Sequence, residues 1–248
     1  MYMYPAGIDK NLIETIAESK KLVHYIDMPI QHINDKILRA MRRPDTKDNI
    51  RRLIEELRGV MPDIVLRTTL ITGFPGETER QFAELLDFVK WAQFDALGCF
   101  KFYPETGTAA AEMPAQVPDE VKQQRLEELM LTQQQIAFAK NKDRIGSKLA
   151  CLVDSVDNST VKGRFYGQAP EIDSLCIIKG PASPKDRKAQ NSRKRCVPKP
   201  GQFINTKVVG TQDYDLLVEW IYTLKGNKFR RKASSVRSPY DCGQRLGL

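Results

Sequence analysis

The spacing of the apolar residues changes once along the chain, near residue 143, and this change constrains the fold more than any other feature. Before it, short runs rich in β-branched residues alternate with segments whose apolar residues recur at helical spacing. After it, short segments of alternating apolar and polar residues follow one another, separated by turn formers such as Asp157 and Asn158. The sequence therefore predicts an α/β region followed by a small all-β domain.

The α/β region contains four strand-like runs, at residues 1–4, 22–28, 64–72 and 96–103. Helices are expected at residues 11–21 and then after Asn34, Thr46 and Thr78, because these side chains can accept hydrogen bonds from the free amides of a first helical turn. A long helix is expected from Pro118 to about residue 143. Parallel strands joined by right-handed crossovers bring their carboxyl ends to one common face, where ligands bind in such folds.

The region after residue 143 contains five strand candidates, at residues 149–156, 161–166, 175–178, 203–209 and 216–222. Five short strands in close succession are typical of a small antiparallel barrel. We expect one domain over residues 1–142, a second over residues 143–222 with a basic insertion at residues 179–201, and a basic tail over residues 223–248.

Two stretches carry more than the whole formal net charge of +8. Residues 179–201 hold eight Lys or Arg against one Asp, and residues 225–237 hold six and no acid, which leaves the rest of the chain at −5. Both stretches are rich in Ser, Pro, Gly and Asn, so we interpret them as loops or tails that contact a polyanion such as RNA. A solvated charge run without a partner is the alternative.

Several classes of protein are excluded by composition. No apolar run reaches the roughly 18 residues that span a bilayer, and residues 1–5 lack the basic region of a signal peptide. The five cysteines are dispersed without a CxxC pair, which argues against a disulfide framework or a zinc site. We therefore expect a cytoplasmic protein that has no membrane partner.

Polar or Gly/Pro-rich turns follow three of the predicted strands, at residues 27–32, 72–78 and 101–108. Gly73 and Gly76 would let the backbone approach a flat or phosphorylated ligand closely, although a plain strand-to-helix turn would also explain them. His32 follows Gln31 in the first of these turns. It is interpreted either as a general base or ligand, or as a hydrogen-bonded structural histidine.

Three carboxylates, Asp27, Glu77 and Glu105, lie in the same turns and are candidates for a set that performs acid–base chemistry. The sequence does not supply the separation that such a set requires. A P-loop, a GxGxxG fingerprint and a nucleophile motif are all absent from the sequence.

Three motifs resemble the later barrel strands of radical S-adenosylmethionine methylthiotransferases: YIDMPIQH at residues 25–32, RTTLITGFPGETERQF at residues 67–82 and FKFYPETGTAA at residues 100–110. GRFYGQAPEID at residues 163–173 resembles a signature of the branch that modifies an aspartate of the twelfth small-subunit ribosomal protein. The resemblance covers residues 1 to about 222. It implies an α/β fold with the last four strands of a partial radical-SAM (β/α) barrel, followed by the small antiparallel β-barrel called a TRAM domain.

That family holds a 4Fe-4S cluster through a CxxxCxxC loop, and the open iron of the cluster chelates S-adenosylmethionine. This sequence contains no such loop. The resemblance therefore implies that the cluster-binding half is missing, that the chain offers no metal ligands and that it is inactive alone. Cys99 is expected to be packed and inert.

The resemblance still implies the adenosine side of an S-adenosylmethionine site. Its residues are Gln31 and His32 near the ribose or methionine, Thr72, Gly73 and Phe74 along the adenine, and Phe102 and Tyr103 as backbone and ring contacts.

The implied partners are a small-subunit ribosomal protein or the ribosome, RNA at the insertion of residues 179–201, and a separate N-terminal half that completes the site. That insertion is longer than the turn usual in the family. The alternatives to this enzyme are an RNA- or ribosome-binding module and a relative that modifies tRNA; the tRNA-modifying branch typically has a serine-containing turn where this chain has Gln31 and His32.

Overall fold

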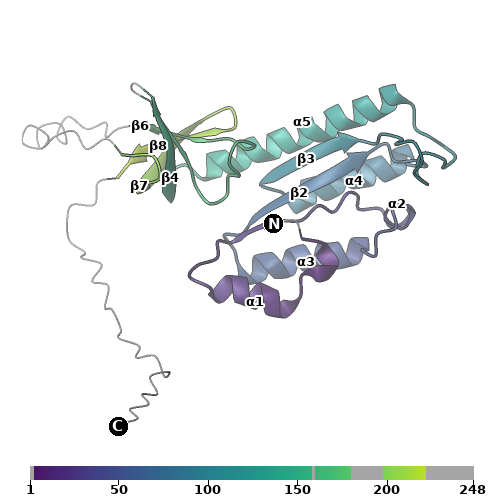
Figure 1. Cartoon of the computed structure of the whole chain (residues 1–248), viewed down its shortest axis with the longest axis horizontal. Helices are drawn as coiled ribbons and strands as arrows, with labels where there is room; N and C mark the ends of the chain where they lie inside the picture. The colour runs from purple at the N-terminus through teal and green to yellow at the C-terminus, as the bar shows by residue number, and fades with distance from the viewer. Residues whose placement is uncertain (1–2, 158–159, 180–197, 222–248) are drawn as a thin grey trace, which may run out of the picture.

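The computed structural model describes residues 3–157, 160–179 and 198–221, and Figure 1 shows two units joined by one long helix. Most of the basic insertion and all of the tail that the sequence singles out lie outside the described residues. No helix in the described part is long and apolar enough to cross a membrane.

The first unit is a parallel sheet in the order β1-β2-β3 with helices on one face. Its strands are β1 (Tyr25–Asp27), β2 (Val65–Thr72) and β3 (Ala96–Lys101). Its helices are the short 3-10 turn η1 (Pro5–Gly7), α1 (Lys10–Glu18), α2 (Asp35–Ala40), α3 (Lys47–Val60), α4 (Glu79–Ala92) and α5 (Asp119–Asp143). The alternation predicted from the sequence is confirmed from β1 onward.

The strand expected at residues 1–4 is wrong for the described residues of that segment. Met3 donates one backbone hydrogen bond to the carbonyl of Asp27, at 3.0 Å, but Met3 and Tyr4 belong to no strand. Pro5 ends the extended segment, because its ring fixes the backbone for the turn of η1 and it has no N–H to donate to a ladder. The described sheet therefore has three strands rather than four.

The predicted helix caps at Asn34, Thr46 and Thr78 are confirmed. Each side chain accepts a hydrogen bond from a backbone amide in the first turn of the helix that follows. At Thr78 the bond is reciprocal, since Gln81 also accepts from the Thr78 amide in a capping box. These caps fix where each helix begins behind a strand end.

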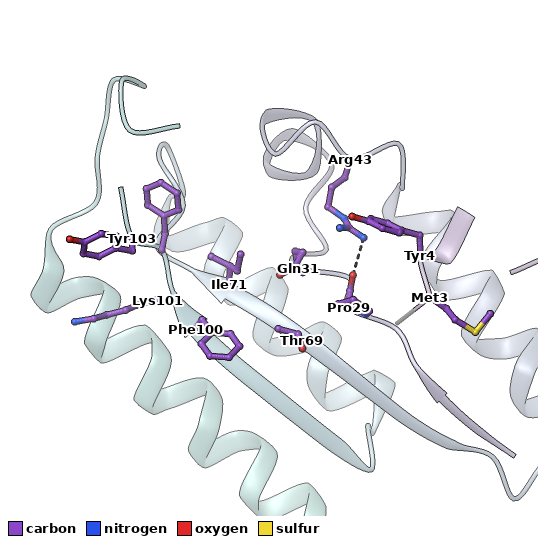
Figure 2. Close-up of a pocket in the computed structure, with 11 residues that line it drawn as sticks. Met3, Tyr4, Pro29, Gln31, Arg43, Thr69, Ile71, Phe100, Lys101 and Tyr103 are labelled. Carbon is purple, nitrogen blue, oxygen red and sulfur yellow. Dashed lines mark hydrogen bonds between the residues drawn. The ribbon is translucent and has the colours of Figure 1, made fainter. Parts of the chain in front are cut away.

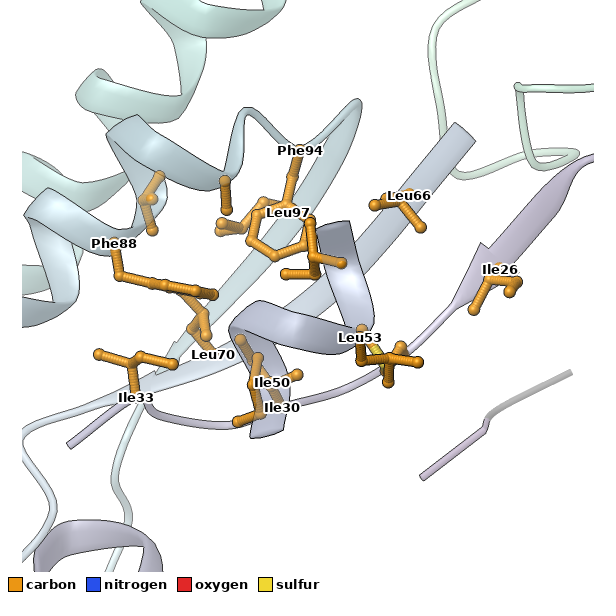
Figure 3. Packing of buried hydrophobic residues seen from close by; sticks show 14 of the residues in the cluster. Ile26, Ile30, Ile33, Ile50, Leu53, Leu66, Leu70, Phe88, Phe94 and Leu97 are labelled. Atoms are coloured by element: carbon orange, nitrogen blue, oxygen red, sulfur yellow. The ribbon is translucent and has the colours of Figure 1, made fainter. Parts of the chain in front are cut away.

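The two faces of the sheet differ in burial. In β2, the side chains of Leu66, Leu70 and Thr72 are buried on the face that the helices cover, and Figure 3 shows part of this core. Arg67, Thr69 and Ile71 alternate with them and are only partly buried on the opposite face. The second face of the sheet is thus open in the described structure.

The second unit is a closed five-stranded barrel in the order β4-β5-β6-β8-β7. Its strands are β4 (Lys148–Asp157), β5 (Thr160–Arg164), β6 (Cys176–Lys179), β7 (Phe203–Gln212) and β8 (Asp215–Trp220). The five strands predicted from the alternating pattern are confirmed. The barrel is not fully antiparallel, because β6 and β8 pair in parallel.

The barrel packs against the end of the sheet where the strands begin. Arg67 forms an ion pair with Asp173 at 2.6 Å, the Tyr166 hydroxyl donates to the carbonyl of Asp63 at 2.8 Å, and Val65 belongs to the apolar core of the barrel. The carboxyl ends of the strands lie at the opposite end of the sheet, away from the barrel (Figure 1).

Candidate functional site

A groove with a volume of about 620 Å³ lies on the open face of the sheet, at the carboxyl ends of the strands (Figure 2). Its lining residues come from the segment before η1, the turn after β1, the turn after α2, and strands β2 and β3 with the turn that follows: Met3, Tyr4, Pro29, Gln31, Arg43, Thr69, Ile71, Phe100, Lys101, Phe102 and Tyr103. This volume is sufficient for a nucleoside-sized ligand.

Gln31 occupies the wall of this groove in a strained backbone conformation. Its φ is +66°, in the left-handed region that residues other than Gly rarely adopt. Two backbone hydrogen bonds hold it there, from its amide to the Thr69 carbonyl at 2.9 Å and from the Ile71 amide to its carbonyl at 2.8 Å. The side-chain oxygen Oε1 is buried and has no hydrogen-bond partner. Such an orphaned acceptor beside a groove is a candidate ligand contact.

Arg43 also lines the groove, and the sequence analysis did not single it out. Its guanidinium donates to the Pro29 carbonyl at 2.9 Å, pairs with Asp45 at 3.2 Å and lies 4.9 Å from the centre of the Tyr4 ring. Its Nε is buried without a partner. No sequence pattern separates Arg43 from its neighbour Arg42, so only the contact with the turn after β1 reveals it.

His32 points away from the groove into the core. The side chain is fully buried, Nδ1 accepts from the Asn34 amide at 2.9 Å, and Nε2 lies 3.5 Å from a carboxylate oxygen of Glu77. That carboxylate also pairs with Arg125 at 2.9 Å and accepts from the Gly73 amide at 3.0 Å. These contacts are those of a structural histidine behind the site.

The other predicted residues fall in two layers. Phe102 and the exposed Tyr103 line the groove. Thr72, Gly73 and Phe74 lie behind it, where the Thr72 carbonyl accepts from the Phe102 amide at 2.8 Å and the rings of Phe74 and Phe102 meet edge to face at 5.1 Å. Gly73 has a φ of +72°.

The three candidate carboxylates are not brought together. Asp27 pairs with Arg67 on the open face, and burial raises its pKa although Arg67 opposes that shift. Glu77 is in the buried cluster with Arg125, and Glu105 is exposed in the turn after β3. The structure therefore assembles no pair of carboxylates for acid–base chemistry from these residues.

The described residues do not fit an iron–sulfur cluster. They contain no group of three or more His, Cys, Asp or Glu side chains that is arranged to hold a metal ion. Burial raises the pKa of the Cys99 thiol to about 12, which disfavours the thiolate that a metal requires. Cys151 and Cys176 are fully buried in the barrel, and Cys196 and Cys242 lie outside the described residues.

The protein is a two-domain α/β protein. Its parallel sheet carries a ligand-sized groove at the strand ends and is joined to a closed five-stranded barrel. The model of the radical SAM superfamily matches residues 2–89, and the model of the TRAM domain matches residues 145–221. The chain therefore combines a region similar to the radical SAM superfamily with a region similar to the TRAM domain.

Relatives named ribosomal protein uS12 methylthiotransferase RimO are similar over most of the chain. The protein of Bdellovibrio bacteriovorus is 40% identical over 222 residues, which cover 88% of this chain and 45% of that one. The protein of Thermodesulfovibrio yellowstonii is 44% identical, with 75% and 44% covered, and that of Geobacter sulfurreducens is 42% identical, with 89% and 47% covered. The chain thus spans about half the length of the curated relatives that it matches.

Proposed function

We propose that this chain provides the adenosyl-binding groove and the TRAM domain of an enzyme that attaches a methylthio group to an aspartate of ribosomal protein uS12. The two domain matches and the names of the similar proteins support this assignment over a tRNA-modifying one. We assign residues 1–142 to the radical SAM part, 143–222 to the TRAM domain and 223–248 to a tail. A ribosomal substrate implies action in the cytoplasm.

The observation that carries the proposal is the groove at the strand ends, which is lined by Gln31 and Arg43, each with a buried polar atom that has no hydrogen-bond partner. S-adenosylmethionine has the complementary groups and, when bound, supplies the methyl group and the radical chemistry. A ribose hydroxyl would donate to Gln31, and the methionine carboxylate would accept from Arg43. The purine would lie along Phe102 and Tyr103.

The buried residues named in the sequence support this groove from behind. His32 and Glu77 hold the turns after β1 and β2 together, since Glu77 contacts both the imidazole and the Gly73 amide. Thr72 and Phe74 fix Phe102 through its backbone amide and its ring. We propose that cluster ligands come from polypeptide outside these 248 residues, because no CxxxCxxC loop is present.

Calorimetry with S-adenosylhomocysteine, which needs no cluster to be chemically stable, tests the proposal. We expect binding by the wild type and at least a tenfold loss of affinity in Gln31→Leu and in Arg43→Met, because each change removes a charged or polar contact. Arg39→Met is the control, since Arg39 lies on α2 and bonds the Asp35 carbonyl outside the groove. A wild type that does not bind, or variants that bind equally, would contradict the proposal.

A second candidate function, RNA or ribosome binding, is favoured by the outer face of β4 and β7. Lys148 and Lys207 lie directly opposite each other and are exposed, although like charges in that register destabilise a sheet. Phe203 lies on the same face with 71% of its surface exposed. Exposed lysines and an exposed aromatic ring on one face of a barrel fit the phosphates and bases of single-stranded RNA.

A further inference from the structure

One side chain behind the groove is held by contacts that neither the sequence nor the proposed function explains. Lys122, in the first turn of α5, is only 5% exposed. In the described structure no hydrogen bond or ion pair reaches its ammonium group. The nearby Asp119 bonds Lys101 instead, at 2.8 Å. A lysine side chain that is buried to this degree is uncommon. Its charge still acts on Asp119, whose pKa is lowered by the hydrogen bond from Lys101 and by the charges of Lys101 and Lys122.

The stem of Lys122 fills the space beside Gly73. A Cβ added to Gly73 would lie 2.3 Å from Cγ of Lys122, closer than any real contact of such atoms. Two separate reasons therefore favour Gly at position 73. Its backbone has a positive φ, and the lysine stem occupies the space that a Cβ would need. The stem and the turn fit together as one packed unit.

The ammonium of Lys122 lies over the face of the Phe102 ring. Nζ is 5.4 Å from the ring centre, within the range of a cation–π contact. Phe102 lines the groove, and its ring also contacts Phe74. One side chain on α5 thus contacts both the turn after β2, which lies behind the groove, and the turn after β3, which lines it.

From this arrangement we infer that Lys122 is a positioning residue for the purine end of the groove: its stem fixes the Gly73 turn and its ammonium fixes the Phe102 ring. The inference rests on the proposed function for the identity of the ligand. The geometry of the ring does not depend on a ligand, so it can be measured separately.

The first test is fluorine NMR of a chain that carries 4-fluorophenylalanine at position 102. Lys122→Met keeps most of the stem but removes the charge, so we expect a shifted or broadened fluorine resonance. Lys122→Arg keeps a cation over the ring and is expected to restore the wild-type resonance. An unchanged resonance in Lys122→Met overturns the inference whether or not any ligand binds.

The second test is the affinity for S-adenosylhomocysteine. Lys122→Met is expected to bind about three- to tenfold more weakly, while its urea midpoint of unfolding stays nearly unchanged. Lys122→Arg is expected to bind with the wild-type affinity. Phe102→Leu removes the ring and should weaken binding on its own. In that background Lys122→Met should have no further effect, because the two residues act through one contact. Additive losses would overturn the inference, whereas a wild type that binds no ligand would contradict only the proposed function.

Discussion

Arg125 of α5 and Glu77 of the turn after β2 form an ion pair at 2.9 Å in which the glutamate side chain is completely inaccessible. The same arginine donates to the Glu77 carbonyl at 3.1 Å, and Glu77 in turn contacts His32 and the Gly73 amide. A buried pair of this kind adds little net stability by itself, but removing one partner leaves a charge without compensation. The pair therefore links α5 to the strand ends that carry the groove.

We expect Arg125→Met to lower the free energy of unfolding by about 3–5 kcal/mol, because it leaves the Glu77 carboxylate buried and unpaired. The double variant Arg125→Met with Glu77→Gln should recover part of this loss, since no net charge then remains. Urea unfolding measures both. The control is Lys90→Ala, which breaks the exposed pair with Asp87 at 3.9 Å and should change little. If Arg125→Met and Lys90→Ala lowered the free energy of unfolding equally, this account would be wrong.

The second prediction concerns the pH dependence contributed by Glu84 of α4. Burial would raise its pKa, but hydrogen bonds from Lys47 and Asn34, each at 2.6 Å, lower it below the ordinary value of 4.5. A lowered pKa means that the folded state favours the carboxylate, so its contribution to stability is present above that ordinary value and is lost as pH falls through the folded pKa.

Glu84→Gln should therefore unfold more readily than the wild type near pH 7, and the difference should shrink progressively as the pH falls below 4.5. Thermal unfolding across this range measures the difference. Glu56→Gln on the exposed side of α3 is the matched control and should show no such trend. A difference that grows toward low pH would have the wrong sign for this mechanism.

The third prediction separates stability from binding at Gln31. Because Gly adopts a positive φ without steric cost, Gln31→Gly should keep the free energy of unfolding within about 1 kcal/mol of the wild type. It should nevertheless weaken the binding of S-adenosylhomocysteine at least tenfold, as in Gln31→Leu, since the orphaned amide oxygen is gone. Gln93→Gly, at another left-handed position that ends α4, is the control and should leave binding intact. Binding that survives unweakened in Gln31→Gly would remove Gln31 from the site.

Much of the fold could be predicted from the sequence, because periodicity and caps are local signals. The helices behind Asn34, Thr46 and Thr78 begin where the side-chain acceptors predicted. The strand expected at residues 1–4 is not formed by Met3 and Tyr4. Met3 makes one backbone hydrogen bond to Asp27, and the turn η1 begins at Pro5 before a ladder can form. The parallel pairing of β6 with β8 depends on barrel closure, a relationship between distant segments that no local pattern records.

The groove was harder to predict than the elements that build it. The sequence identified which turns meet, but not which face each side chain takes. Gln31 lines the groove, whereas the next residue, His32, is fully buried on the opposite side. Arg43 and Lys122 reach their sites from helices or turns distant in sequence, so only tertiary packing reveals them. The roles of the seven predicted residues toward a ligand stay predictions.

The fourth prediction concerns iron. Expressed anaerobically and supplied with iron and sulfide, the chain alone should bind no stoichiometric cluster and should not cleave S-adenosylmethionine, because the sequence has no CxxxCxxC loop. Iron analysis together with the absorbance near 400 nm measures this, and one cluster would correspond to about four irons per chain. Four irons bound per chain would show that other residues supply the ligands.

The last prediction concerns RNA. If Lys148 and Lys207 each neutralise one phosphate, replacing both by Ser should make the slope of log affinity against log salt shallower by about 1.4 on single-stranded RNA, at about 0.7 per contact. Phe203→Ser should weaken binding without changing the slope, because base stacking releases no counterions. Both variants should keep the barrel folded, since all three side chains are exposed.

A further variant tests the basic insertion, most of whose charged residues lie outside the described part of the chain. It replaces six of them by Ser: Lys185, Arg187, Lys188, Arg193, Lys194 and Arg195. If about four contact phosphates, the slope should become shallower by about 3, equally for all RNA sequences, because phosphate contacts carry no sequence information. Lys90→Ser on α4 is the control for a lysine remote from the barrel. A salt titration with the same slope and affinity for all variants would exclude an RNA role, and the excess charge would then affect only solubility.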